Sequence, residues 1–271
     1  MKKISSFLII SLTYLLSFTS DRIFTYSYQS NVLEKGQMDL ETSNTLRFKK
    51  LDFYRAIDSR LEFEVGVGKN TQTAFYFNFS QDAKAVLNGA DVTIEKSFDI
   101  SFSNEWLHHF KNPVSDKIGV AAYGEFKIGL QEIELESKLI LDKQINKFTT
   151  VGNIILEYEI TKDFKNVSGK IKPMRKHELK LNFTYGASYE IGKGFNIGLE
   201  ILSNNVFVVG EKLQHSTLFL GPTLAYKHDR FWLAATVMPQ VIAFKGRSEG
   251  VKLDLDEFER IQTRLLFAYS F

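Results

Sequence analysis

The sequence contains no cysteine and only 4 prolines, and it has almost no excess of charge, with 34 Lys and Arg residues against 32 Asp and Glu residues. Without cysteine, the chain cannot form a disulfide scaffold, a thiolate-ligated zinc site, a cysteine nucleophile or a lipoprotein anchor. The balanced charge argues against a nucleic-acid reader with a basic surface, so we expect no nucleic acid among the partners.

Long hydrophobic runs are also missing after residue 20. The longest candidate, residues 231–244, is interrupted by Pro239 and Gln240. A helical membrane span needs about 20 consecutive apolar residues, so a bundle of transmembrane helices is excluded. The chain is nevertheless 44% hydrophobic and 24% charged, a composition that can bury a core and is not typical of disorder.

The first 20 residues have the pattern of a secretory signal peptide. Two lysines precede an apolar stretch at residues 7–18, and the small residues Thr19 and Ser20 follow. A buried N-terminal helix is the weaker alternative, because the stretch is apolar all round and the pattern changes directly after it. We expect cleavage near Ser20 and a single domain over residues 21–271.

From residue 37 onward, apolar and polar residues alternate with the period of two that is typical of strands. Twelve such segments are predicted, at residues 38–49, 60–67, 75–80, 97–106, 118–128, 132–141, 153–160, 178–191, 195–201, 218–226, 231–242 and 261–271. Pro222 and Pro239 each remove a backbone donor, so we expect a bulge or a strand end near them.

The connections between these segments alternate in length. Five are short, at residues 68–70, 109–116, 142–146, 192–194 and 227–230. Four are long and polar, at residues 81–91, 161–176, 203–215 and 243–257. Tight turns at one end and long loops at the other are typical of outer-membrane β-barrels, although residues 129–131 break the rule.

Alternation alone does not separate a soluble β-barrel from a membrane barrel, because both have one apolar face. In an outer-membrane barrel the apolar face contacts lipid and the polar face lines the lumen. On that assumption the candidate lumen residues include Arg60, Glu62, Glu64, Glu125, Lys127, Glu134, Glu157, Lys180 and Arg264. Acids outnumber bases on this face, so the predicted lumen is mildly acidic.

The last strand carries the most specific motif. Leu265, Phe267, Tyr269 and the terminal Phe271 resemble the C-terminal signature of bacterial outer-membrane β-barrel proteins. The resemblance implies an all-β fold, a closed antiparallel up-and-down barrel in the outer membrane of a Gram-negative bacterium. It also implies insertion by the barrel-assembly machinery and contact with outer-membrane lipid and lipopolysaccharide. Within this class the chain looks most similar to small porin-like or transporter-like barrels.

The sequence offers little support for catalysis. His108 and His109 are adjacent and would point to opposite faces of a strand, so they cannot share a metal or a proton. Residues 186–190 lack the closing glycine of a nucleophile elbow, and residues 192–198 are predicted to form a hairpin turn rather than a dinucleotide loop. We therefore expect no enzymatic activity, no catalytic residue, no cofactor and no metal.

Two charged clusters leave alternatives open. Glu132, Glu134 and Glu136 share one strand face and could bind calcium or act as a carboxylate pair. An ion-pair network is favoured, with the bases Lys127, Lys138, Arg60 and Arg264 as partners. The basic segment could bind lipopolysaccharide phosphates or simply be a solvated loop; its residues are Lys162, Lys165, Lys170, Lys172, Arg175 and Lys176.

These observations favour a pore or transporter for small polar solutes, with a mixed-charge, mildly acidic lumen. The main alternative is a structural or surface-interaction barrel whose lumen is closed by its own ion pairs. An outer-membrane enzyme and a β protein outside the membrane are weaker hypotheses.

The terminal motif generates a prediction about assembly. Deleting Phe271 should lower the amount of protein inserted in cells far more than it lowers stability after refolding in detergent. The reason is that one lipid-facing aromatic residue contributes only about 1.5 to 3 kcal/mol of burial. Outer-membrane fractions and denaturant titrations measure the two effects, and equal effects would make the motif an ordinary strand end.

Overall fold

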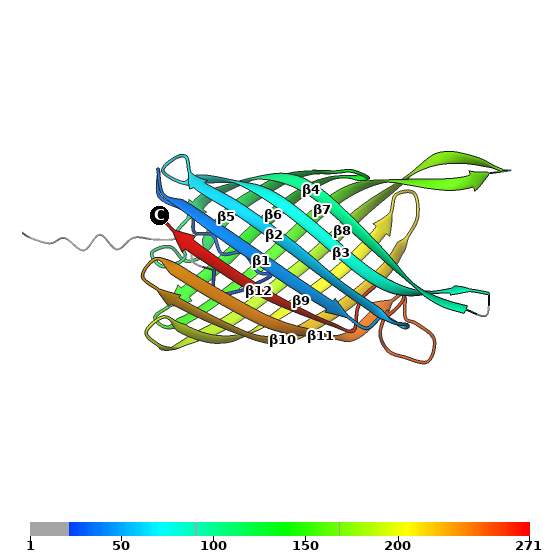
Figure 1. Ribbon diagram of the computed structural model, residues 1–271. Coiled ribbons are helices and arrows are strands. Elements are labelled where there is room, and N and C mark those ends of the chain that lie inside the picture. Colours follow the sequence, from blue (N-terminus) through cyan, green and yellow to red (C-terminus); the bar gives the residue numbers. More distant parts are fainter. Residues whose placement is uncertain (1–21, 90, 168) are drawn as a thin grey trace, which may run out of the picture.

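The computed structural model describes residues 22–89, 91–167 and 169–271, which form one closed barrel of twelve antiparallel strands (Figure 1). The expected signal peptide, residues 1–20, lies outside the described residues. The strands are β1 (Met38–Phe48), β2 (Tyr54–Gly66), β3 (Thr71–Asn88), β4 (Asp91–Lys111), β5 (Gly119–Gly129), β6 (Glu132–Ile145), β7 (Phe148–Val167), β8 (Lys170–Gly192), β9 (Phe195–Val208), β10 (Leu213–His228), β11 (Phe231–Lys245) and β12 (Ile261–Ser270). The predicted all-β barrel and its strand number are confirmed. Within the described ranges, no helix is long and apolar enough to cross a membrane.

The barrel closes where the two ends of the chain meet. β1 pairs with β12 from Asp39 opposite Ser270 to Phe48 opposite Ile261, and each other strand pairs with its neighbours in sequence. Closure uses the backbone donors and acceptors of both outermost strands, which would otherwise be exposed edges. A wall of this kind can face hydrocarbon, because its backbone groups are paired within the barrel.

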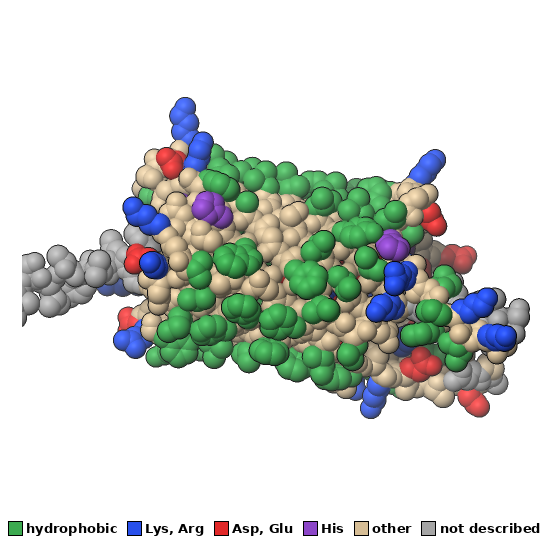
Figure 2. Space-filling model, turned by 90° about the horizontal axis from the view of Figure 1, so that it is seen from above, with side chains coloured by type: hydrophobic (Ala, Val, Ile, Leu, Met, Phe, Trp, Pro, Cys, Tyr) green, Lys and Arg blue, Asp and Glu red, His purple; other side chains and the backbone are tan. Residues whose placement is uncertain are grey.

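The outer face is apolar and the inner face is polar. In β3, for example, Phe77 is 53% exposed, whereas the preceding residue, Tyr76, which faces the other side of the wall, is 0% exposed. Figure 2 shows hydrophobic side chains over the middle of the barrel wall, with charged side chains gathered toward both ends. This inverted distribution is the one expected when the outer face contacts lipid.

Short connections are present at all five predicted places, although residues 109–111 and 142–145 belong to the ends of β4 and β6, and three of the four predicted long loops are wrong. Residues 81–91, 161–176 and 203–215 mostly continue the strands, and Figure 1 shows the β3–β4 and β7–β8 hairpins extending beyond the barrel. Where both faces of a strand meet water the alternation disappears, although backbone pairing continues. The predicted loop at 243–257 is borne out, because β11 ends at Lys245 and β12 begins at Ile261.

The expected irregularity near the prolines is present. The pairing of β10 with β11 shifts register between Ser216 and Thr217 and again between Leu218 and Phe219. Next to Pro222, a Cβ atom on Gly221 would lie 1.8 Å from the Val237 carbonyl oxygen. The two strands therefore approach closely here, and only glycine fits.

The chain between the expected signal peptide and β1 lies inside the barrel. We call residues 22–37 the N-terminal segment; it enters at the end where the C-terminus lies (Figure 1). Phe24 is 0% exposed and packs in an apolar cluster with wall residues that include Leu107, Tyr123 and Ile140. Ile23 packs both there and against a second cluster, formed by β10–β12. The segment thus reaches from one wall of the lumen to the other.

The apolar outer face predicts that the cost of an introduced charge on β8 depends on its depth in the membrane. Phe183→Arg places a cation on the outer face near the middle of the barrel wall and should cost about 2 to 4 kcal/mol of folding free energy in lipid. Tyr189→Arg, on the same face close to the β8–β9 turn, should cost at most about 1 kcal/mol. Unfolding titrations in lipid vesicles measure both values, and similar costs at the two positions would argue against a lipid-facing wall.

Candidate functional site in the barrel lumen

Glu200 on β9 holds the N-terminal segment by its backbone. Its carboxylate accepts hydrogen bonds from the backbone amides of Thr25 (2.9 Å), Tyr26 (3.0 Å) and Ser27 (2.9 Å). The hydroxyls of Thr25 and Thr236 donate to the same carboxylate. Consecutive amides converging on one anion form a concave anion-binding site, and each bond is strengthened by the charge. Glu200 itself is 0% exposed.

Other wall side chains continue this attachment along the segment. The Asn153 side chain accepts from the Tyr28 amide (2.7 Å) and donates to the Tyr28 carbonyl (2.9 Å), as a neighbouring strand would. The pattern repeats on other strands, with Asp142 accepting from the Ser30 amide and Gln72 accepting from the Leu33 amide. Several backbone groups between Thr25 and Leu33 are therefore paired by wall side chains rather than by a sheet.

The Tyr28 ring of the segment lies between two cations, one from the segment itself and one from the wall. The Tyr28 ring lies 4.0 Å from the Arg22 guanidinium and 4.0 Å from the Lys138 ammonium, measured to the ring centroid. Lys138 also lies 3.8 Å from the Tyr123 ring. Burial raises the pKa of Tyr28 to about 12, so the phenol stays neutral. Cation–π contacts of this kind strengthen when water is excluded.

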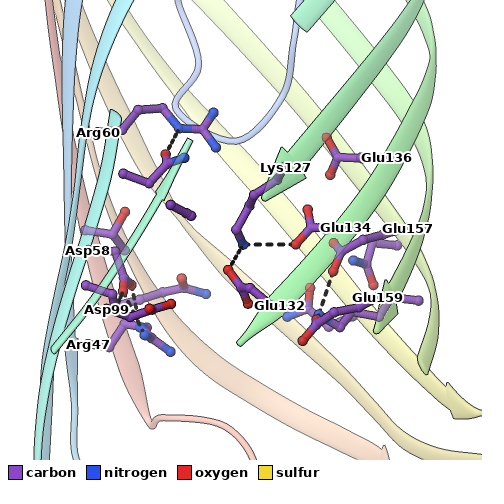
Figure 3. A pocket seen from close by; sticks show the side chains of 18 of the residues that line it. Arg47, Asp58, Arg60, Asp99, Lys127, Glu132, Glu134, Glu136, Glu157 and Glu159 are labelled. Carbon is purple, nitrogen blue, oxygen red and sulfur yellow. Dashed lines mark hydrogen bonds and ion pairs between the residues drawn. The ribbon is translucent and has the colours of Figure 1, made fainter. Parts of the chain in front are cut away.

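The other half of the lumen is a cavity of about 730 Å³ (Figure 3). Tyr26 lines it from the N-terminal segment, and residues 257–259 line it from the β11–β12 loop. Eleven acids line the cavity: Asp58, Asp82, Asp99, Glu132, Glu134, Glu136, Glu157, Glu159, Glu178, Glu257 and Glu259. Five bases face them: Arg47, Arg60, Lys127, Lys180 and Arg264.

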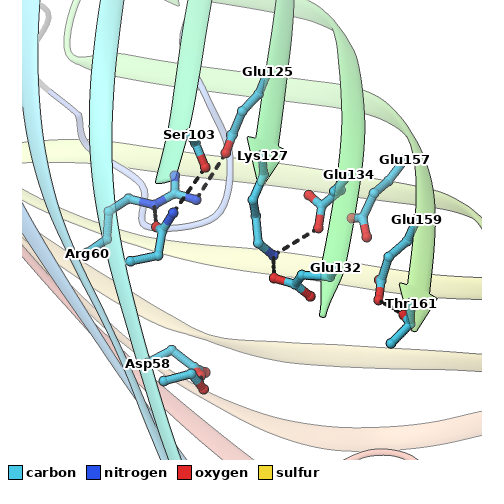
Figure 4. Close-up of polar contacts among 12 residues, drawn as sticks. Asp58, Arg60, Ser103, Glu125, Lys127, Glu132, Glu134, Glu157, Glu159 and Thr161 are labelled. Atoms are coloured by element: carbon cyan, nitrogen blue, oxygen red, sulfur yellow. Dashed lines mark hydrogen bonds and ion pairs between the residues drawn. The ribbon is translucent and has the colours of Figure 1, made fainter. Parts of the chain in front are cut away.

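Ion pairs organise one wall of this cavity (Figure 4). The Lys127 ammonium lies 2.7 Å from a Glu132 oxygen and 3.0 Å from a Glu134 oxygen. Lys138 pairs with Glu136 at 2.7 Å, so the predicted ion-pair network is confirmed for the row of three glutamates.

The four bases expected to serve that row divide between different partners. Lys127 and Lys138 bind it, as predicted. Arg60 lies 3.5 Å from Glu125, and Arg264 donates to the Thr45 hydroxyl and to the Thr25 carbonyl. The Arg264 interaction is thus with the N-terminal segment and β1 rather than with the row.

All nine predicted lumen residues lie on the inner face. Arg60, Lys127, Glu134, Glu157, Lys180 and Arg264 line the cavity. Glu62, Glu64 and Glu125 are buried deeper in the lumen. The predicted assembly residues Leu265, Phe267, Tyr269 and Phe271 are exposed on the outer side, between 39% and 64%.

The two adjacent histidines point to opposite faces, as predicted. His109 contacts the Ser30 carbonyl inside the lumen, whereas His108 contacts the Thr71 hydroxyl on the exposed side. The two side chains therefore do not form a joint site.

Sequence reasoning placed Glu200 among the acids of the polar face but missed the N-terminal segment and the role of Glu200 as its anchor. A signal was present, because Phe24, Tyr26 and Tyr28 alternate with small polar residues directly after the expected signal peptide. That pattern is too short to distinguish a strand from a linker, and its partners lie far away in sequence.

The anchor generates a prediction about the segment. Glu200→Gln removes the charge that strengthens the backbone hydrogen bonds, a loss of about 1.5 to 3 kcal/mol. Because the chain has no cysteine, a single Ser27→Cys reporter can be labelled with a water-soluble maleimide. Labelling should be roughly tenfold to 100-fold faster in the Glu200→Gln background.

Glu190→Gln is the matched control, because Glu190 accepts from the Gly194 amide at the β8–β9 turn. It should leave the labelling rate of the Ser27→Cys reporter unchanged. Equal labelling in the two backgrounds would mean that Glu200 does not hold the segment.

Several solved outer-membrane proteins share this fold. The COG4313 outer membrane channel from Pseudomonas putida F1 has a TM-score of 0.61 and 7% identity, covering 89% of this chain and 98% of that chain. The beta domain of the Bordetella autotransporter Brka has a TM-score of 0.51 and 10% identity, covering 88% and 100%. The NanC porin has a TM-score of 0.50 and 11% identity, covering 85% and 98%.

At these identities the likeness concerns the fold, which is that of bacterial outer-membrane β-barrels. A comparison with curated protein sequences finds no significant match. Residues 16–271 match a family of unknown function (DUF6662), and the chain belongs to that family.

Proposed function

We propose that the protein is an outer-membrane channel for small polar solutes, with a preference for cations, whose periplasmic half is closed by the N-terminal segment. The observation that carries the proposal is the cavity of about 730 Å³, lined by eleven acids and five bases and ending at Tyr26. Similar folds include a channel and a porin, which supports a transport role.

The preference for cations follows from the lining. Lys127 and Lys180 each neutralise part of a carboxylate pair, but the wall still carries more acids than bases. Carboxylates that surround a narrow aqueous passage attract cations and repel anions. A cavity of several hundred Å³ suits a small solute rather than a polymer.

The closed half implies that passage requires the N-terminal segment to move. The segment is held by hydrogen bonds, ion pairs and cation–π contacts, all of which can break without covalent change. Glu200 and Asn153 hold its backbone, and Arg22 pairs with Glu41 at 3.5 Å. The channel is therefore proposed to have a closed state, the one described, and an open state in which the segment has left the lumen.

The location belongs to the same proposal. The apolar outer face and the terminal motif at Phe271 favour the outer membrane, reached through the periplasm, with insertion by the barrel-assembly machinery. The β7–β8 hairpin projects beyond the barrel at the opposite end and carries Lys162, Lys172 and Arg175. These cations would face lipopolysaccharide phosphates.

A second candidate is a structural or surface-interaction barrel that never opens. The observation that favours it is the packing of the segment, whose Phe24 and Leu33 are 0% exposed. The two candidates differ in whether removing the segment produces a conducting pore. The proposal includes no catalytic step.

Planar-bilayer recordings test the proposal directly. Wild-type protein should conduct weakly or intermittently, whereas a variant lacking residues 22–35 should conduct steadily and prefer cations in a salt gradient. In that variant, Glu132→Gln with Glu134→Gln should reduce the cation preference, because both carboxylates face the cavity.

Two controls distinguish a variant that fails to conduct because it is unfolded from one that is folded but closed. The deletion variant should still migrate faster unboiled than boiled on gels, and Glu200→Gln should raise the open probability without any deletion. Folded but silent variants would favour the structural barrel, and an anion preference would overturn the assignment of solute charge.

A further inference from the structure

A second group of carboxylates lies deep in the lumen, beside the N-terminal segment. Glu41 on β1 and Glu62 and Glu64 on β2 each present a carboxylate oxygen within 4.8 Å of the others. All three side chains are buried, with at most 5% exposed. They come together because Glu41 stands opposite Glu62 in the β1–β2 register, and residues two apart on a strand share a face.

A fourth carboxylate adjoins this group. Asp39 stands directly opposite Glu64 on the same inner face and is 1% exposed. Neither Asp39 oxygen accepts a well-formed hydrogen bond from any described residue, although the Ser270 hydroxyl lies nearby. A buried carboxylate that has only a hydroxyl beside it, and no basic side chain acting on it, is expensive, so it indicates a positive group missing from its surroundings.

Two arginines are the neighbouring bases, and they compensate the four carboxyls incompletely. The Arg22 guanidinium lies 3.5 Å from a Glu41 oxygen. The Arg60 guanidinium forms its ion pair with Glu125 at 3.5 Å and lies 4.1 Å from the centre of the Tyr76 ring, but it also attracts the Glu41 and Glu62 carboxylates electrostatically.

The lumen contains a second group of three glutamates with similar spacing, which we call the counterpart. Glu134, Glu136 and Glu157 also bring carboxylate oxygens within 4.8 Å of one another. There, however, each glutamate forms an ion pair with a different lysine: Glu134 with Lys127, Glu136 with Lys138 and Glu157 with Lys180. The two trios have the same spacing but different compensation, which makes the counterpart a natural control.

We infer that Glu41, Glu62 and Glu64, with Asp39 adjoining, bind a hard divalent cation of the calcium type. Calcium takes carboxylate oxygens at about 2.3 to 2.6 Å, so two of its ligands lie at most about 5 Å apart. The 4.8 Å limit among the three oxygens matches that sphere. The cation would supply the charge that Arg22 and Arg60 together do not, and it would join β1 to β2 beside the barrel closure.

Terbium luminescence tests this site with the metal alone. Tyr76 stands opposite Glu62 and is 0% exposed, so it can sensitise a Tb³⁺ ion bound there. Full-length protein, folded in detergent and stripped with EDTA, should give a saturable signal that Ca²⁺ displaces. Glu62→Gln should weaken binding at least tenfold, and Glu157→Gln in the counterpart should change it less than twofold.

Thermal unfolding gives a second readout. Ca²⁺ should raise the melting temperature of wild-type protein and of Glu157→Gln, but not that of Glu62→Gln. Asp39→Asn serves if Glu62→Gln does not fold. A wild-type protein without a saturable, Ca²⁺-displaced signal, or equal binding by Glu62→Gln, would overturn the inference and indicate that the carboxyls share protons instead. Neither readout depends on whether the barrel conducts.

Discussion

The pairing of β1 with β12 is the constraint on which the rest of the molecule depends. Once these strands join, the wall has no free edge and the period of two fixes which side chains face outward. The outer face is apolar, so the polar half of the sequence is enclosed in a narrow lumen. Charged groups that a soluble protein would leave in water must here find partners within the barrel, and the ion pairs, the N-terminal segment and the acidic groups all reflect that requirement.

The lumen meets this requirement differently along its length. In the cavity, lysines such as Lys127 bridge neighbouring glutamates and leave an acidic, hydrated space. In the other half, Glu200 is satisfied by backbone amides of the N-terminal segment, so a stretch of chain acts as the counter-group. Buried carboxylates thus line an open cavity in one half of the lumen and hold the N-terminal segment in a packed interior in the other half.

The strands and their faces could be predicted from sequence because lipid and lumen impose opposite polarity on successive residues. Phe183 and its neighbours carry this signal without any knowledge of their partners. The signal fails where both faces meet water, so the extensions of β3 and β7 were mistaken for loops. It also fails for the N-terminal segment, because Thr25 binds Glu200, 175 positions away, and no local pattern encodes such a contact. The sequence predicted that Glu62 faces the lumen. It did not predict that Glu41 lies opposite Glu62, because strand register depends on the pairing of β1 with β2.

The position of the N-terminal segment sets an order on how the molecule is made. The segment precedes every strand in the chain, yet its hydrogen bonds are with β9 and β12 as well as with β3, β6 and β7, and its Ile23 packs against β11. Its binding site is complete only when the last strands have joined the sheet, so a segment that precedes all the strands in the chain docks fully only after them. Until then Phe24 and Tyr26 lack their apolar surroundings, and contacts of such long sequence separation form slowly because loop closure must come first. Completion of the wall and filling of the lumen are therefore successive events, with the interior settling only after the strand pairing is in place.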